Sequence, residues 1–295
     1  MDANTLSYVG ALIAIFAFGT YMAPLKKWPD FSQYATLAAL SWGAVLFSMI
    51  VATATGTWSF SIIGFICGII WHWGGAYCFS AVRHESDLSG TSVRAMGACI
   101  IASFVSGLLI HPEQPLIIWL AIIAVLVLCG GLVILSPNFK GITKKWRSLL
   151  AGTIFGIQLV PYQIYNLSHD LSQLEFAFSY ALGVAVGCHL LLKRYWKREQ
   201  ITFKGKLAPT IVAVLMGALW MAGTHGSFFA IAPDGALGFA VGYPLSQLNL
   251  LVNIAVGVIV FGEYPGLKAR LKLLAAAFVI LAGAVLLTLA KIMAT

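Results

Sequence analysis

The sequence predicts an all-α polytopic membrane protein with ten transmembrane helices, arranged as two inverted five-helix repeats. Three observations carry this prediction. First, 60% of the 295 residues are hydrophobic, only 9% are charged, and the mean hydropathy is +0.91. A soluble domain of this size could not hide so much apolar surface from water. Second, apolar runs of spanning length recur along the chain. Third, two motifs return in the same order in its second half.

The apolar runs give the expected helices in order. Each is close to the ~20 residues that a helix needs to cross the hydrocarbon of a bilayer. The runs are 5–24, 34–53, 60–81, 89–110, 115–135, 148–168, 174–192, 208–230, 236–261 and 268–293. The expected domains are therefore a first repeat at 1–135, a basic cytoplasmic connector at 136–147 and a second repeat at 148–295.

The basic residues indicate the orientation of these helices. Lys26 and Lys27 follow the first run and Lys193 and Arg194 follow the seventh, whereas the connectors after the second, fourth, sixth and eighth runs carry no Lys or Arg. Basic connectors mark the cytoplasmic side. We therefore expect an integral protein of the bacterial inner (cell) membrane with both termini extracytoplasmic.

The repeated motifs predict the two halves. Residues 68–79 read GIIWHWGGAYCF and residues 217–228 read GALWMAGTHGSF, with the same Gly, Trp and Gly spacing. A Phe-Gly pair at 18–19 likewise returns at 155–156, each followed by a proline. Five helices per half invert the second half relative to the first, a plan of secondary transporters whose sites lie near the midplane. The alternative is coincidence, since Gly and Trp are common in membrane helices.

Four short motifs carry a family resemblance. They are PLKKW at 24–28, the GxxWxxG helix, GYPLSQLN at 242–249 and FGEYPG at 261–266. The chain resembles the drug/metabolite transporter superfamily, most closely its glucose/ribose porter and rhamnose transporter branch, and to a lesser degree plant ureide permeases. The resemblance implies a ten-helix secondary carrier working by alternating access. Many members of that superfamily have cytoplasmic termini, whereas the charge pattern here indicates the opposite.

Polar stripes in two runs are candidate substrate-binding surfaces. Ser246, Asn249 and Asn253 share one helical face of the ninth run, and Gln158 and Tyr162 share a face of the sixth. Unpaired amides cannot face lipid. The ninth-run stripe serves either a substrate or hydrogen bonding between helices. Both alternatives stay open at this stage.

Charged and aromatic groups complete the candidates. Arg94 lies within the fourth run and either lines a substrate pathway, where it would favour an anionic group, or snorkels to the cytoplasmic end. His72 and His225 either carry a coupling proton or act as neutral hydrogen bonders, and the latter is our preference. Trp71 and Trp220 either stack on a sugar ring or fill space.

Other chemistries find no support. The chain has no HExxH, no GxSxG and no acidic pair within a span, so we assign no catalytic residues and expect no enzyme. Its five cysteines form no CxxC pair, so we expect no metal site and no cofactor. The basic residues lie between apolar runs and indicate topology, not nucleic-acid binding.

The most consistent function is a secondary transporter of a small polar metabolite, a sugar or sugar-like compound above all, moving it across the lipid bilayer. The alternatives are a carrier of a ureide, a nucleobase-like solute or a small organic anion and, less favoured, a membrane-embedded enzyme or a non-transporting receptor. Proton coupling stays open, and the chain is expected to be a monomer or a homodimer.

Overall fold

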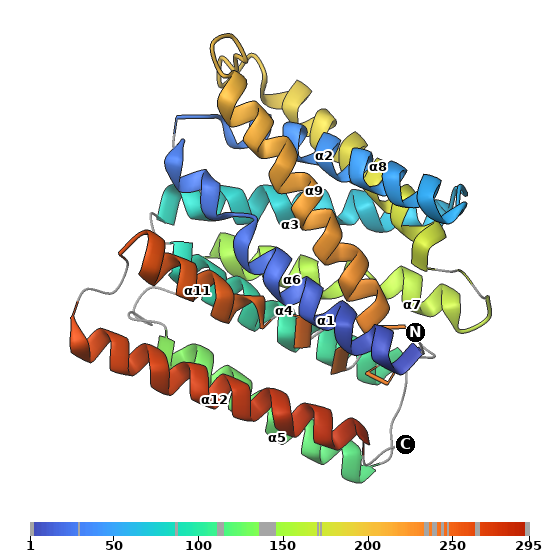
Figure 1. The fold of residues 1–295 in the computed structure, drawn as a ribbon, viewed down its shortest axis with the longest axis vertical. Helices are drawn as coiled ribbons and strands as arrows, with labels where there is room; N and C mark the ends of the chain where they lie inside the picture. The colour runs from blue at the N-terminus through green and yellow to red at the C-terminus, as the bar shows by residue number, and fades with distance from the viewer. Residues whose placement is uncertain are drawn as a thin grey trace.

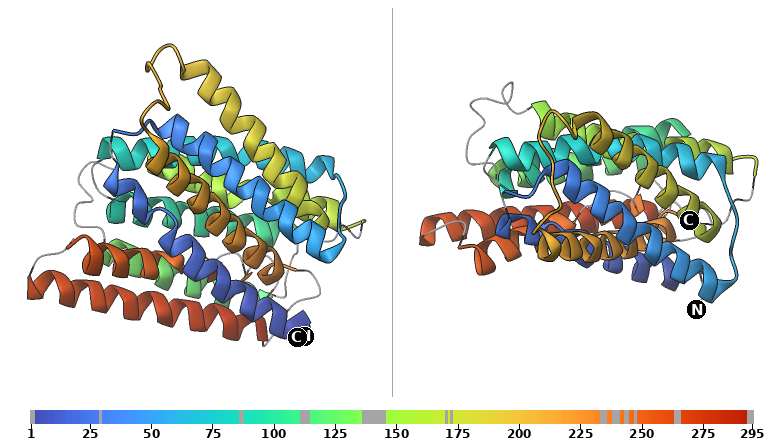
Figure 2. Two further views of the ribbon diagram at one scale, coloured as in Figure 1. Left: turned by 45° about the horizontal axis from the view of Figure 1, so that its top comes forward. Right: turned by 90° about the horizontal axis from the view of Figure 1, so that it is seen from above.

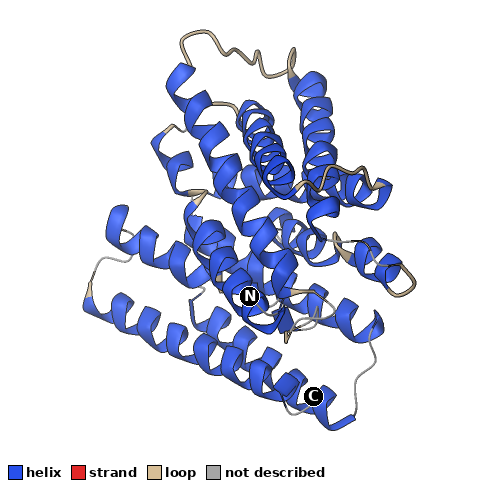
Figure 3. Cartoon of the chain, turned by 45° about the vertical axis from the view of Figure 1, so that its right-hand side comes forward, coloured by secondary structure: helices blue, strands red, loops and turns tan. Residues whose placement is uncertain are grey.

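The computed structural model describes residues 3–28, 30–85, 88–110, 115–135, 146–169, 171, 173–232, 236–237, 241–242, 245–246, 248–262 and 266–292. In these ranges every regular element is a helix (Figure 3), which confirms the all-α prediction. The helices are α1 (Ala3–Thr20), η1 (Ala23–Lys27), α2 (Gln33–Thr55), α3 (Ile62–Glu85), α4 (Leu88–Ile110), α5 (Pro115–Leu135), α6 (Trp146–Ile157), α7 (Val160–Asn166), α8 (Gln173–Tyr195), α9 (Leu207–Ala230), α11 (Asn249–Val260) and α12 (Leu267–Ile292).

Several of these helices are long and apolar enough to cross a membrane. Within the described residues five qualify by length and composition: Ala3–Thr20, Gln33–Thr55, Ile62–Val82, Leu174–Tyr195 and Leu207–Ala230. Their outward faces carry large apolar side chains such as Leu12, Phe16 and Leu215, each more than half exposed. Such faces are stable only against hydrocarbon, so the chain is an integral membrane protein.

The helices form a bundle with a paired outer layer. Figures 1 and 2 show α2, α3, α8 and α9 on one side, α5 and α12 side by side on the other, and α1, α4, α6 and α11 between them. The main packing partners are α2 with α9 and α8, α3 with α8 and α6, α4 with α6, α1 with α9 and α11, and α5 with α12. The middle layer is therefore enclosed by helices and is the place for polar side chains.

Glycines let the α2 and α9 backbones touch. A Cβ atom at Gly43 would lie 1.8 Å from the carbonyl oxygen of Val214, and one at Gly217 would lie 1.8 Å from the carbonyl oxygen of Leu40. Larger residues would force the helices apart. Without a strong hydrophobic force between helices in lipid, such close packing is a main source of association.

The α3–α8 contact is built in the same way. A Cβ atom at Gly68 would lie 2.1 Å from the carbonyl oxygen of Tyr180, and one at Gly183 would lie 2.1 Å from that of Phe65. Gly68 opens the first copy of the repeated motif and Gly217 opens the second. The repeated glycine therefore marks a helix crossing in both places.

The sixth predicted span, 148–168, is not one helix. It breaks into α6 and α7 at Gln158 and Leu159, and Pro161 is the second residue of α7. Proline has no N–H to donate to the carbonyl of Ile157, and its ring would clash with that carbonyl. The continuous helix predicted there is wrong, and the break places Gln158 outside regular structure.

The ninth span, predicted at 236–261, is likewise not continuous. Residues 241–242 and 245–246 are helical, Leu248 forms a turn, and helix α11 begins at Asn249, whereas Ala236 and Leu237 form a bend. Pro244 and Gln247 of this span lie outside the described residues. Of the predicted basic connector 136–147, residues 136–145 lie outside them too.

The chain termini and two basic connectors lie at opposite ends of the bundle. The start of α1 and the end of α12 lie at one end, and the connectors 21–32 and 196–206 lie at the opposite end (Figure 1). An even number of crossings places both ends of a chain on the same side of a membrane. These two basic connectors therefore lie at the end of the bundle away from the termini.

Candidate functional site

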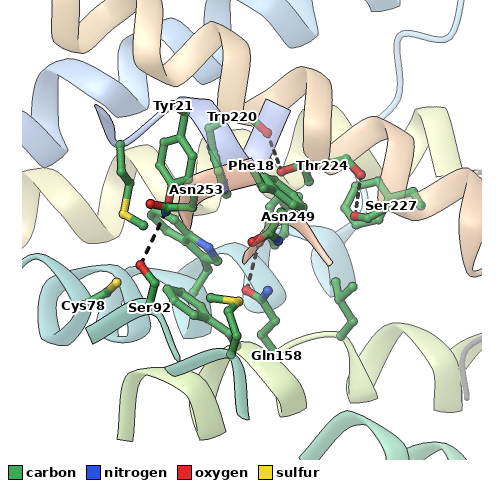
Figure 4. A pocket seen from close by; sticks show the side chains of 17 residues that line it. Phe18, Tyr21, Cys78, Ser92, Gln158, Trp220, Thr224, Ser227, Asn249 and Asn253 are labelled. Carbon is green, nitrogen blue, oxygen red and sulfur yellow. Dashed lines mark hydrogen bonds between the residues drawn. The ribbon is translucent and has the colours of Figure 1, made fainter. Parts of the chain in front are cut away.

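A central cavity lies where α1, α3, α4, α9 and α11 meet the α6–α7 break (Figure 4). The cavity volume is about 50 Å³, which is several times the ~10–15 Å³ that one water molecule needs. Its lining residues are Phe18, Tyr21, Met22, Trp71, Cys78, Ser92, Met96, Phe155, Gln158, Leu159, Tyr180, Trp220, Thr224, Ser227, Phe228, Asn249 and Asn253.

Aromatic rings form one part of this lining. The ring centroids of Trp71 and Trp220 are 4.2 Å apart with an interplanar angle of 39°. Phe155 packs 5.9 Å from Trp71 and Tyr180 packs 6.1 Å from Trp220, both centroid to centroid. The two indoles lie against each other, with no space for a solute between them. This continuous ring surface offers flat apolar contact with a few N–H and O–H groups at its edges.

Amides form the polar part. The Tyr180 hydroxyl donates to Gln158 Oε1 at 2.9 Å, and the Asn249 Nδ2 group donates to the backbone carbonyl of Ser246 at 3.0 Å. Asn253 Nδ2 donates to Ser92 Oγ at 3.4 Å, which ties α11 to α4. The Ser246 carbonyl can only accept, so it fixes the direction of the Asn249 amide. Gln158 is placed at the cavity by the break between α6 and α7.

The described lining of the cavity carries no charged side chain. Among the described residues that line it there is no Asp, Glu, Lys, Arg or His. In the described part of the chain, no group of three His, Cys, Asp or Glu residues could hold a metal ion. The lining therefore offers neutral hydrogen bonds and ring faces, a chemistry suited to an uncharged polar solute.

Five of the ten predicted site residues line this cavity, namely Trp71, Gln158, Trp220, Asn249 and Asn253. The other five, His72, Arg94, Tyr162, His225 and Ser246, lie outside its lining. Ser246 still participates, because its backbone carbonyl accepts the bond from Asn249. Tyr162 is fully buried and its hydroxyl donates to the carbonyl of Leu171 at 3.5 Å, which caps the turn after α7.

Arg94 joins α4 to α6. Its Nε donates to Ser148 Oγ at 3.0 Å, and its guanidinium also reaches Thr91 Oγ1 at 3.5 Å. The side chains of Glu85 and Asp87, toward which snorkelling was an alternative, lie outside the described residues. In this arrangement Arg94 holds two helices together beside the cavity and does not face it.

The two histidines pack against other helices. A ring nitrogen of His72 contacts the backbone carbonyl of Ile69, and the ring lies against Gly187 of α8, where a Cβ atom would come within 2.5 Å of it. His225 is 8% exposed and packs against Phe47 and Phe228 at centroid distances of 5.7 and 6.5 Å. Neither ring reaches the cavity.

Sequence reasoning missed several lining residues. Phe18 and Phe155 belong to the repeated Phe-Gly pair, and Thr224 and Phe228 share the helical face of Trp220 in the repeated motif, so a signal for these four was present. Ser92 had no such signal. The Thr224 hydroxyl donates to the backbone carbonyl of Trp220 at 3.0 Å within α9. Sequence alone does not tell such a bond within one helix from a bond to a solute.

Comparison with known proteins gives a consistent result. A model of the family described as "Sugar transport protein" matches residues 10–290. A "Putative sugar uptake protein YxfA" of Lactococcus lactis is 22% identical over 95% of this chain and 97% of its own length. A "Putative sugar uptake protein" of Bacillus cereus is 24% identical over 95% and 98%. A solved crystal structure covers 99% of this chain and 100% of its own with a TM-score of 0.70 at 15% identity, which shows a shared fold.

Proposed function

The chain belongs to the sugar transport protein family, and from this premise we propose that it takes up an uncharged sugar through the cavity between α3 and α9. The protein is a membrane sugar transporter. Its relatives are named as sugar uptake proteins and not as enzymes. Uptake by alternating access, with Trp71, Trp220, Gln158, Asn249 and Asn253 contacting the sugar, is the specific mechanism proposed.

The observation that carries this proposal is the composition of the cavity. A pyranose has apolar C–H faces and a rim of hydroxyl groups. The paired indoles offer ring surface for the faces, and the three amides offer neutral donors and acceptors for the rim. An organic anion would need a positive partner, and Arg94, the candidate from the sequence, lies outside the described lining and donates to Ser148. An uncharged substrate therefore fits better than an anion.

Equivalent helix crossings support two related halves. A shift of 140 residues carries Gly43 of α2 onto Gly183 of α8, and a shift of 149 carries Gly68 of α3 onto Gly217 of α9. The shift of 149 also carries Phe65, whose carbonyl oxygen faces Gly183, onto Val214, whose carbonyl oxygen faces Gly43. The shift of 140 carries Leu40, whose carbonyl oxygen faces Gly217, onto Tyr180, whose carbonyl oxygen faces Gly68. Thus the α2–α9 and α3–α8 crossings are two copies of one contact.

The outer pair of helices follows the same rule. A Cβ atom at Gly131 of α5 would lie 2.5 Å from Ile280 of α12, and one at Gly283 of α12 would lie 2.8 Å from Leu128 of α5. A shift of 152 carries Leu128 and Gly131 onto Ile280 and Gly283. The shift thus exchanges the two sides of the α5–α12 contact, as expected where a two-fold axis relates two halves of a chain. Inverted repeats of this kind permit alternating access, in which one half rocks against the other.

The proposed orientation rests on charge. The connectors 21–32 and 196–206, which carry basic residues, lie at the end of the bundle opposite to the termini (Figure 1). The positive-inside rule then assigns that end to the cytoplasm and the termini to the outside. With this orientation, uptake carries sugar from the side of the termini toward the basic connectors.

Uptake into proteoliposomes tests the proposed function. The purified protein is reconstituted and offered a radiolabelled panel of D-glucose, D-ribose, L-rhamnose, D-glucuronate, D-glucose 6-phosphate and allantoin, with and without a pH gradient. We expect saturable uptake of at least one neutral sugar and none of the two anions. Uptake of allantoin or of an anion without any neutral sugar would overturn the proposal. Protein-free liposomes are the control.

A further inference from the structure

We infer that Asn249 and Gln158 bind two different sugar hydroxyls through hydrogen bonds of opposite direction. Tyr180 fixes which end of the Gln158 amide faces the sugar. Asn249 is the acceptor, which receives a hydroxyl hydrogen, and Gln158 is the donor, which gives a hydrogen to a hydroxyl oxygen. This inference rests on the proposed function and adds the residues that determine specificity. Tyr180 is a positioning residue, because its hydroxyl acts through the Gln158 amide.

The orientation of Asn249 follows from its partner. Its amide contacts the backbone carbonyl of Ser246 at 3.0 Å, and a carbonyl can only accept a hydrogen bond. The NH2 end of Asn249 must therefore face Ser246. Asn249 is 5% exposed and lines the cavity. Its oxygen is thus the end of the amide that can accept a hydrogen from a solute there.

The orientation of Gln158 is the reverse. The Tyr180 hydroxyl donates to its Oε1 atom at 2.9 Å, so the oxygen end is held toward α8. Tyr180 is 1% exposed and its ring packs against Phe176, Trp220 and Phe228, which fixes the position of the hydroxyl. The NH2 end of Gln158 is then the donor end of this amide.

The two amides come from separate elements at the same cavity. Gln158 stands in the break between α6 and α7, and Asn249 is the first residue of α11 (Figure 4). A substrate that satisfies both must donate from one position and accept at another. A solute without a donor at the first position leaves the buried Asn249 oxygen without compensation, which is the strongest basis for rejecting an analogue.

Fluorinated sugars separate the two roles. Replacing a hydroxyl by fluorine removes its hydrogen but leaves a weak acceptor, whereas replacing it by hydrogen removes both. The probes are D-glucose with its single-position deoxy and deoxyfluoro analogues, measured as competitors of labelled D-glucose in proteoliposomes of the full-length protein. If D-ribose alone is taken up, the deoxy and deoxyfluoro riboses replace them.

We expect one ring position at which both replacements weaken binding of the wild-type protein by roughly 3–10-fold, and this loss should vanish in Asn249→Ala. At a second position, the deoxy sugar should bind more weakly than the fluoro sugar, and this difference should vanish in Gln158→Ala. Asn249→Ser is the second variant for Asn249, since its hydroxyl is too short to take the place of the amide oxygen.

Tyr180→Phe tests the positioning role because it keeps the ring and removes only the hydroxyl. It should abolish the deoxy–fluoro difference at the Gln158 position and leave the Asn249 position unchanged. The matched control is Tyr162→Phe, which also removes a buried tyrosine hydroxyl but lies outside the cavity lining. That control should keep the complete wild-type analogue pattern.

The outcomes are separable. If no neutral sugar binds the wild-type protein, the proposed function fails and this inference fails with it. If sugars bind but Asn249→Ala and Asn249→Ser weaken all analogues equally, the acceptor role is wrong. If Tyr180→Phe keeps the deoxy–fluoro difference, or lowers the affinity for every analogue by the same factor, Tyr180 does not set the direction of Gln158.

Discussion

The indole rings of Trp71 on α3 and Trp220 on α9 touch at a centroid distance of 4.2 Å. The two residues occupy the same place in the repeated motif, third after its first glycine. A separation of 4.2 Å leaves no room for a sugar ring between the indoles, so a sandwich between them is excluded in this arrangement. A sugar that contacts both must lie across their exposed edges inside the cavity.

Removing either indole should weaken sugar binding. Trp71→Ala and Trp220→Ala each delete part of the ring surface, and stacking on aromatic rings is worth ~1–3 kcal/mol in nucleic-acid sites, an order we transfer to sugar faces. We expect a corresponding loss of affinity for the transported sugar, measured by competition in proteoliposomes, with normal expression in the membrane. Trp119→Ala, at a tryptophan that is 66% exposed on α5, is the control. Unchanged affinity in both cavity variants would assign the indoles to packing.

The glycine crossings predict a contrast in stability. Gly217→Ala adds a methyl group where the carbonyl oxygen of Leu40 is 1.8 Å away, so α2 and α9 must separate. Gly130→Ala is the matched control, because a Cβ atom at Gly130 of α5 meets nothing within 4 Å. We expect Gly217→Ala to lower the Tm of the detergent-solubilised protein and Gly130→Ala to leave it unchanged or raise it, since Ala favours helix. Equal Tm values for both variants would contradict a tight α2–α9 crossing.

Much of the fold followed from the sequence because lipid leaves few choices. A backbone in hydrocarbon must bond internally, so long apolar runs become helices, and the predicted range 208–230 became α9 at 207–230. The repeat also assigns Trp71 and Trp220 to equivalent positions in the two copies of the motif. The ten spans, the inverted repeat and the orientation remain predictions that the packing supports.

The remainder depends on neighbours that sequence spacing does not specify. His72 shares a helical face with Trp71, yet its ring lies against Gly187 of α8 and only Trp71 reaches the cavity. Ser92 lines the cavity because α11 brings Asn253 within 3.4 Å of it, a contact across 161 residues. Pro161 accounts for the break between α6 and α7, but sequence spacing does not show that Gln158 stands in that break, 6% exposed, and lines the cavity.

The orientation is testable by labelling. Single cysteines are introduced at Ala3 and Lys204 in a background lacking the five native cysteines. Ala3 begins α1, and Lys204 lies in the connector before α9, at the opposite end of the bundle. An impermeant maleimide applied to intact cells should label position 3 and spare position 204, because basic connectors remain cytoplasmic. Labelling after cell lysis controls for accessibility, and the reverse pattern would overturn the assignment.

The last prediction concerns coupling, and it depends on where the histidines lie. Both histidines lie outside the cavity lining, His72 against α8 and His225 between Phe47 and Phe228. In the described part of the chain neither ring has a carboxylate hydrogen-bond partner with which to exchange a proton. A coupling proton must be bound and released in step with the substrate, which requires a titrating group that senses the site.

We therefore expect the double variant His72→Gln/His225→Gln to transport sugar with the wild-type pH dependence. Glutamine keeps a hydrogen-bonding end and cannot titrate, so any proton role is removed while packing is largely kept. The measurement is initial uptake between pH 5.5 and 8, with and without an imposed pH gradient, beside downhill exchange as a control for folding. If accumulation driven by the gradient occurs in the wild type and disappears in the variant while exchange survives, at least one histidine carries the proton, and our preference for neutral histidines is wrong.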